Sequence, residues 1–151
     1  MLKSKNPNYE AYVRLKIERN KFMQLIGFQI DEIQEGEVNG TMPVKEMHEQ
    51  QNGFVHGGII SSLSDMACGF AAYSLVEEGV QVFTIEIKVS YLRPGIGQEI
   101  KAKGWVLKAG KQFINCESEL YAVNDSESKL IAKASSTMAV IDRAVNDKYG
   151  D

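Results

Sequence analysis

The chain has 151 residues, of which 44% are hydrophobic and 25% charged, a composition typical of one globular domain spanning residues 1–151. It carries 17 basic and 20 acidic residues, so its charge offers no overall attraction to nucleic acid or to a membrane surface, and we expect neither partner. The N-terminal region lacks the apolar stretch of a secretory signal peptide, which favours a cytoplasmic location.

The first predicted element is an amphipathic helix within residues 1–27, which Gly27 ends. Its apolar residues recur mostly at helical spacing and are Tyr9, Tyr12, Val13, Ile17, Phe22, Met23 and Ile26. A basic amphipathic helix can bind a membrane, but Glu10 and Glu18 dilute the positive charge of this one. We therefore expect it to lie on the protein's own domain.

Two short strands are predicted next, over residues 28–35 and 37–44, with a turn at Gly36 between them. The polar segment 45–54 that follows is predicted to be a loop. This loop carries Gln50 to the start of the next element.

Residues 57–76 form the segment around which the chain is organised, because these twenty residues contain a single charge, Asp65. Their apolar side chains recur every three or four residues, and this spacing predicts a helix that is buried nearly all round. The stripe comprises Ile59, Leu63, Met66, Phe70 and Tyr73. The segment is long enough to cross a bilayer, but its serines, its glycines and Asp65 argue against a membrane span.

Four further strands are predicted from the alternation of polar and apolar residues. They cover residues 82–92, 98–108, 113–123 and 129–141. Two strands, one long helix and then four strands predict an α+β fold, in which the helix packs against one curved antiparallel sheet of about six strands. Residues 142–151 are predicted to form a frayed tail.

The long helix contains two groups that suit catalysis. Gly57, at its N-terminus, offers free backbone N–H groups and the positive end of the helix dipole to a developing oxyanion. Asp65 lies eight residues further on, roughly 12 Å along the axis, so one helix cannot bring both groups to one reacting carbonyl. Two antiparallel helices related by a two-fold axis can, and we therefore expect a homodimer with composite sites at its interface.

The residues around these two groups resemble a known family, the hotdog-fold acyl-CoA thioesterases of the phenylacetate-pathway and Arthrobacter-type 4-hydroxybenzoyl-CoA kind. The likeness covers about residues 27–141 and centres on His56-Gly57-Gly58, with an acid at the ninth position after the histidine and Gln50 six residues before it. It implies a hotdog fold and hydrolysis of an acyl-CoA to the free acid and coenzyme A. We expect homodimers that pair into homotetramers.

The resemblance implies roles for the matching residues. The backbone N–H of Gly57 polarises the thioester carbonyl, and Asp65 either attacks that carbonyl or activates water. The Arthrobacter-type enzymes carry a hydroxyl residue one turn after the acid, where this chain has Gly69, so Thr84 is a candidate for supplying the missing hydroxyl. Because a thioester has a good leaving group, a carboxylate and an oxyanion donor suffice, and no metal or other cofactor is expected.

Each candidate also has an ordinary structural interpretation. Asp65 could be a helix carboxylate satisfied by a nearby serine, and Thr84 an ordinary strand residue. Gln50 could hold the carbonyl or the attacking water, or be a polar loop residue. His56 could transfer a proton, or shape the turn before the helix. His48 and His56 are the only histidines and the two cysteines lack ligand spacing, so the sequence offers no zinc site.

Charge and apolar character suggest the substrate-binding residues. Arg93 and Lys111 lie in Leu-Arg-Pro and Gly-Lys turns that resemble the family's nucleotide-binding edge, and could pair with coenzyme A phosphates or be solvated surface residues. Gly58, at the helix start, is a further candidate substrate contact. The acyl group is expected to enter an apolar tunnel. Candidates for its lining, each of which suits the core equally well, are Phe54, Phe70, Tyr73 and Phe83.

Two rival functions keep the same fold. A non-catalytic hotdog protein that binds or senses acyl-CoA has no need for a lone carboxylate beside the carbonyl pocket. A hotdog dehydratase or hydratase needs a histidine and an acid placed to move a proton at carbon, and residues 50–65 do not resemble those motifs. The sequence therefore favours the hydrolase.

Overall fold

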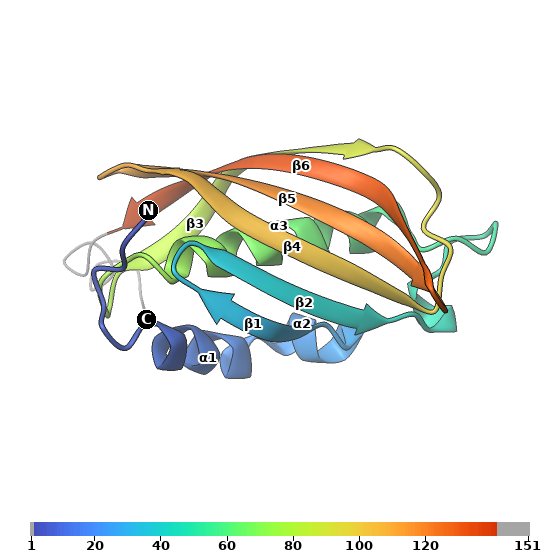
Figure 1. Ribbon diagram of the computed structural model, residues 1–151, viewed down its shortest axis with the longest axis horizontal. Helices are drawn as coiled ribbons and strands as arrows, with labels where there is room; N and C mark the ends of the chain where they lie inside the picture. Colours follow the sequence, from blue (N-terminus) through green and yellow to red (C-terminus); the bar gives the residue numbers. More distant parts are fainter. Residues whose placement is uncertain (1, 142–151) are drawn as a thin grey trace.

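The computed structural model describes residues 2–141, so the predicted tail 142–151 lies outside its described part. A six-stranded antiparallel sheet curves around one long helix (Figure 1). The helices are α1 (Tyr9–Arg19), α2 (Lys21–Ile26) and α3 (Gly57–Tyr73), and a short 3-10 helix covers Glu46–His48. The strands are β1 (Gln29–Gln34), β2 (Glu37–Pro43), β3 (Gln81–Tyr91), β4 (Glu99–Ala109), β5 (Phe113–Asn124) and β6 (Glu127–Ile141). The predicted α+β architecture is confirmed.

The strand order, β1-β2-β4-β5-β6-β3, places the strand that follows α3 at an edge of the sheet. β3 pairs with β6, and the register of this pair shifts between Thr84 and Glu86. Three large side chains of β3 are more than half exposed, Phe83 at 55%, Ile85 at 57% and Tyr91 at 52%. Exposed apolar residues on an edge strand favour pairing with another chain, so β3 is suited to an interface.

The long helix lies against the sheet at a point where the sheet has no side chain. A Cβ built on Gly104 of β4 would lie 2.5 Å from the carbonyl oxygen of Ala67 and 2.8 Å from its Cβ. Gly104 pairs in register with Ser118 of β5, which pairs in turn with Ala134 of β6. This row of small residues lets the backbone of α3 approach the sheet closely.

Substituting Gly104→Ala is expected to lower the free energy of unfolding by about 3 kcal/mol, because the added methyl would overlap the backbone of α3. Gly69→Ala is the matched control, since a Cβ at Gly69 would meet no atom within 4 Å. Urea denaturation of both variants measures the difference. Alanine in place of helical Gly69 is expected to be neutral, or stabilising by up to about 1 kcal/mol. Equal effects at the two positions would contradict the close approach.

The N-terminal helical segment is present, but it is two helices and not one. Asn20 has an extended backbone, and its side-chain Oδ1 accepts a hydrogen bond of 2.9 Å from the N–H of Met23. Asparagine caps a new helix better than it continues an old one, so the chain bends here. Gly27 ends α2, as predicted, and has a left-handed backbone conformation. α1 and α2 lie beside β1, and α1 contacts α3 (Figure 1).

The long helix is shorter than predicted. It ends at Tyr73, whereas the apolar pattern extends to Val76. Ser74 stops it, because the Ser74 hydroxyl donates to the Ala71 carbonyl and accepts from the N–H of Gly36. Among residues 2–141, no helix combines the length and the apolar character that a membrane span requires.

Candidate active site

The start of α3 is built around its histidine. His56 has φ of −60° and ψ of 136°, and its Nδ1 accepts a hydrogen bond of 2.8 Å from the N–H of Gly58. This is an N-cap, which satisfies one of the free donors at the helix terminus. The N–H of Gly57 has no acceptor within the part of the chain that the structure describes. The helix therefore begins with a backbone donor that remains available to a ligand.

An open pocket of roughly 360 Å³ lies in front of Gly57. Four of the residues singled out in the sequence line it together: Gln50, Phe54, Gly57 and Arg93. Its other lining residues are Val55, Ile60, Tyr91, Leu92, Pro94 and Gly95. The loop before α3 and the segment after β3 thus meet at the N-terminus of the helix.

Tyr91, the last residue of β3, was not predicted from the sequence as a site residue. Its hydroxyl donates a hydrogen bond of 3.1 Å to the carbonyl of Gly57 and contacts the hydroxyl of Ser61. A Cβ at Gly57 would lie 3.4 Å from the Tyr91 ring. No sequence signal links the two positions, because only the packing of β3 beside α3 brings them together.

The side chain of Gln50 is half-buried in the loop before α3. Its Oε1 accepts a hydrogen bond from the N–H of Asn52, and its backbone carbonyl accepts one from Gly53, which takes a positive φ of 77°. Within residues 2–141 its Nε2 has no acceptor. Gln50 therefore presents an amide donor to the same pocket as the Gly57 N–H.

Asp65 is half-buried on α3, eight residues after Gly57. The Thr84 hydroxyl of β3 donates a hydrogen bond of 2.6 Å to Asp65 Oδ1. Asp65 Oδ2 has no donor among the described residues. Thr84 thus supplies a hydroxyl to this carboxylate, in a chain where Gly69 stands one helical turn away with open space around it.

His48 stabilises the loop before α3 through hydrogen bonds. It is buried, its Nδ1 accepts from the N–H of Lys45 at 3.0 Å, and its backbone carbonyl accepts from the N–H of His56 at 2.7 Å. Burial lowers the pKa of the His48 imidazole, so the ring is neutral at pH 7. The histidine was considered from the sequence only as a metal ligand, and its contribution is to hold the His56 cap in place.

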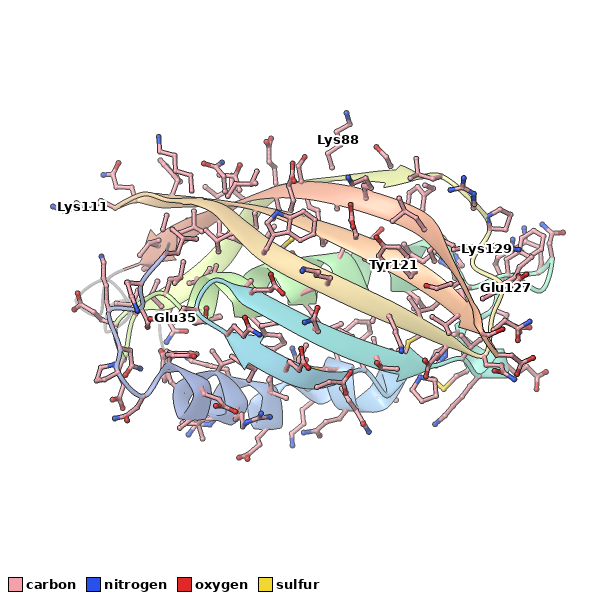
Figure 2. The ribbon with its side chains drawn as sticks, in the orientation of Figure 1. Glu35, Lys88, Lys111, Tyr121, Glu127 and Lys129 are labelled. Carbon is pink, nitrogen blue, oxygen red and sulfur yellow. The ribbon has the colours of Figure 1, made fainter. Side chains whose placement is uncertain are left out.

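The two predicted phosphate-binding residues lie far apart in one chain. Arg93 donates to the backbone carbonyl of Leu130 at 2.9 Å and lines a groove with Lys129. Lys111 lies in the turn between β4 and β5. Figure 2 shows Lys111 and Lys129 at opposite ends of the sheet. One chain alone therefore cannot gather Arg93 and Lys111 around one nucleotide.

The structure places the four predicted tunnel residues in different environments. Phe54 lines the pocket, and Phe70 is buried in the core. The Tyr73 hydroxyl donates to Gln81 Oε1 at 3.0 Å and accepts from the N–H of Val82 at 3.0 Å. Phe83 was a candidate for a tunnel lined by strands of both subunits, and one chain alone gives it no such lining role. Its neighbours in β3 face the helix side, so Phe83 projects from the outer face of the sheet, where it is exposed.

The cysteines and the acidic groups provide no alternative chemistry in the described residues. Cys68 and Cys116 are buried, and burial raises the pKa of both thiols, which keeps them protonated. Among residues 2–141, no group of three or more His, Cys, Asp or Glu side chains could hold a metal ion. Among the described residues, Asp65 and the backbone donors around Gly57 are therefore the groups that remain as candidates for chemistry.

A curved antiparallel sheet wrapped around one long helix is the hotdog fold, here with a donor-bearing helix start and a carboxylate on the same helix. The family model described as the thioesterase superfamily matches residues 52–129, and the chain belongs to this family. It is a thioester hydrolase, and the resemblance seen in its sequence is confirmed.

Three similar proteins illustrate this relationship. A thioesterase family protein from Silicibacter pomeroyi superposes with a TM-score of 0.87 and 36% identity, covering 89% of this chain and 98% of that one. Acyl-coenzyme A thioesterase 13 from Mus musculus is 31% identical over 97 residues, which are 64% of this chain and 67% of the mouse protein. The E. coli PaaI protein, from the phenylacetic acid degradation operon, shares the fold, with a TM-score of 0.79 and 24% identity over 89% of this chain and 94% of that one.

Proposed function

We propose that this protein hydrolyses acyl-CoA thioesters to the free acid and coenzyme A, in composite sites of a homodimer. Each site combines Asp65 of one protomer with the Gly57 N–H of its partner. The observation that carries the proposal is the lone, half-buried Asp65 carboxylate, which Thr84 holds in place. The activity that gives the mouse relative its name, acyl-CoA hydrolysis, supports the same substrate class.

The geometry of β3 supports the dimer. Thr84, near one end of β3, contacts Asp65, and Tyr91, at the other end, contacts Gly57. Pairing two β3 edges antiparallel, about a point midway between these residues, would set Asp65 of each protomer opposite Gly57 of the other. The exposed apolar side chains of the β3 edge favour such a contact.

In this arrangement each group has a separate task. The Gly57 N–H and the helix dipole stabilise the negative charge that develops on the thioester oxygen. Asp65 either attacks the carbonyl carbon, forming an anhydride that water then opens, or removes a proton from water as the water attacks. In both routes the C–S bond breaks and coenzyme A leaves as a thiolate that takes up a proton. The Gln50 amide is placed to hold the carbonyl or the water.

Hydrolysis of a panel of acyl-CoAs, followed by the appearance of free thiol, tests the proposal. At least one acyl-CoA is expected to be turned over, and the protein's own buried cysteines should add little background. Light scattering in parallel should give the mass of a dimer or of a pair of dimers. Tight acyl-CoA binding without thiol release would favour the non-catalytic binder, and an active monomer would contradict the composite site.

A further inference from the structure

Two hydroxyl groups converge on the carbonyl of Gly57. Ser61, one turn further along α3, donates from its Oγ at 2.9 Å, and Tyr91, at the end of β3, donates from its phenol at 3.1 Å. The two hydroxyls also contact each other. In an α-helix this carbonyl also accepts the N–H of the residue four positions on, so three donors gather at an oxygen with two lone pairs. The Gly57 carbonyl is thus held from both α3 and β3.

The same peptide group connects these hydroxyls to His56. The carbonyl of Gly57 and the N–H of Gly58 belong to one planar peptide, and that N–H donates to His56 Nδ1 at 2.8 Å. The contacts therefore form a chain from the Tyr91 phenol through the peptide to the imidazole, in which each hydrogen bond polarises the next. Because Nδ1 accepts, the proton of the neutral ring lies on Nε2. The chain thus fixes both the orientation and the tautomer of His56.

The start of α3 needs such support, because Gly57 and Gly58 have no side chains to restrict their backbone. Glycine loses more conformational freedom on folding than any other residue, and the first turn of a helix frays readily. The N–H of Gly57 has no partner within the helix, so its direction depends on the backbone torsions of this turn. Fraying would turn the N–H away from a bound thioester carbonyl.

Packing alone does not explain the hydroxyl of Tyr91. The side chain is 52% exposed and lines the open pocket in front of Gly57. A phenylalanine ring could lie against Gly57 in the same way, but it could not donate to the carbonyl. The same strand carries Thr84, whose hydroxyl donates to Asp65. One edge strand therefore supplies a hydroxyl to each of the two groups that the proposed reaction uses.

We propose that Tyr91 and Ser61 are positioning residues for hydrolysis, whose hydroxyls hold the Gly57–Gly58 peptide so that the Gly57 N–H faces the thioester carbonyl. The proposal rests on the proposed function, because it takes this N–H as the oxyanion donor. Both hydroxyls act through the backbone and not on the reacting atoms. In the composite site, Thr84 of one protomer would hold the acid, and the partner's Tyr91 would hold the donor.

A double-mutant cycle on turnover tests the proposal. Tyr91→Phe and Ser61→Ala are each expected to lower kcat about fivefold with KM unchanged, because each removes one hydrogen bond that positions the donor. Both hydroxyls act on one carbonyl, so their effects should overlap. The double variant is therefore expected to lose about tenfold in kcat, and not the roughly 25-fold that independent effects would give.

Ser62→Ala provides the matched control for the cycle. The Ser62 hydroxyl donates to the carbonyl of Gly58 at 2.8 Å, one residue beyond the carbonyl that Ser61 contacts. Within residues 2–141, no hydrogen bond joins Ser62 to Tyr91. In combination with Tyr91→Phe, the effects of Ser62→Ala on kcat should therefore multiply.

Hydrogen exchange of the Gly58 amide, followed by NMR, gives a second readout that does not depend on turnover. It is expected to be about fivefold faster in Tyr91→Phe than in the native protein, because the first turn of α3 would open more often. Unchanged exchange, native kcat in both single variants, or independent effects of Tyr91→Phe and Ser61→Ala would overturn the proposal. A changed oligomeric mass of Tyr91→Phe would also overturn it, since the loss of rate would then report on the interface. Failure of the proposed function looks different, because the native protein itself would then hydrolyse no acyl-CoA.

Discussion

Asp65→Asn is expected to lower kcat for thioester hydrolysis by about a thousandfold, with little change in KM. An amide can neither attack the carbonyl as a carboxylate does nor remove a proton from water. The fold should tolerate the change, because the amide oxygen of the introduced asparagine could still accept the hydrogen bond that Thr84 donates at 2.6 Å in the native protein. Steady-state thiol release and the melting temperature, measured on the same preparation, separate loss of chemistry from loss of structure.

The chain contains a matched control for this variant. Asp31 also accepts a hydrogen bond from a threonine hydroxyl, that of Thr41 at 2.7 Å, but it lies exposed on β1. Asp31→Asn makes the same chemical change away from α3 and should retain native turnover. If Asp65→Asn keeps more than about a tenth of the native rate, the role assigned to this carboxylate is wrong.

Gly57→Pro is expected to lower kcat by about a hundredfold, because proline lacks the backbone N–H that would stabilise the oxyanion. Proline is well suited to this position. Gly57 is the first residue of α3, where the N–H has no partner within the helix, and His56 has the extended backbone that a residue before proline requires. Helix stability should therefore be retained, and Gly57→Ala, which keeps the N–H but also brings a Cβ to 3.4 Å from the Tyr91 ring, separates loss of the donor from crowding. Native melting behaviour with full activity would contradict the assignment.

Mixing these two inactive variants tests the composite site directly. In a heterodimer of Asp65→Asn with Gly57→Pro, one site carries both defects and the other carries neither, because each site takes its acid and its donor from different protomers. Heterodimers isolated with two affinity tags should recover about half of the native activity per dimer. If each site lay within one protomer, both sites would stay defective and no activity would return.

The regular elements were predictable because their patterns are local. The alternation of β3 to β6 and the lone charge of α3 can be read from neighbouring residues, and the predicted strands agree closely with the observed ones. The division of the N-terminal helix was missed because Asn20 is compatible with a helix on spacing alone. Its preference for capping prevails once α2 can start there.

The contacts that build the site were only partly predictable, because they join distant segments. Thr84 was named from the missing hydroxyl at Gly69, but its bond to Asp65 spans 19 residues and depends on β3 lying beside α3. The Tyr91 contact with Gly57 spans 34 residues and left no pattern in the sequence. His48 was visible only as a possible ligand, since its burial follows from the packing of the loop.

The register shift in β3 between Thr84 and Glu86 has a mechanical consequence for the proposed dimer. In the proposed dimer, the pairing of the two β3 strands would align both active sites. A slip of two residues in this pairing would move each Asp65 away from the partner's Gly57 by roughly 7 Å. The shift itself lies in the pairing of β3 with β6, so it sets where β3 of each protomer places Thr84 and Tyr91 on its own sheet. The two active sites would therefore be correctly aligned, or misaligned, together.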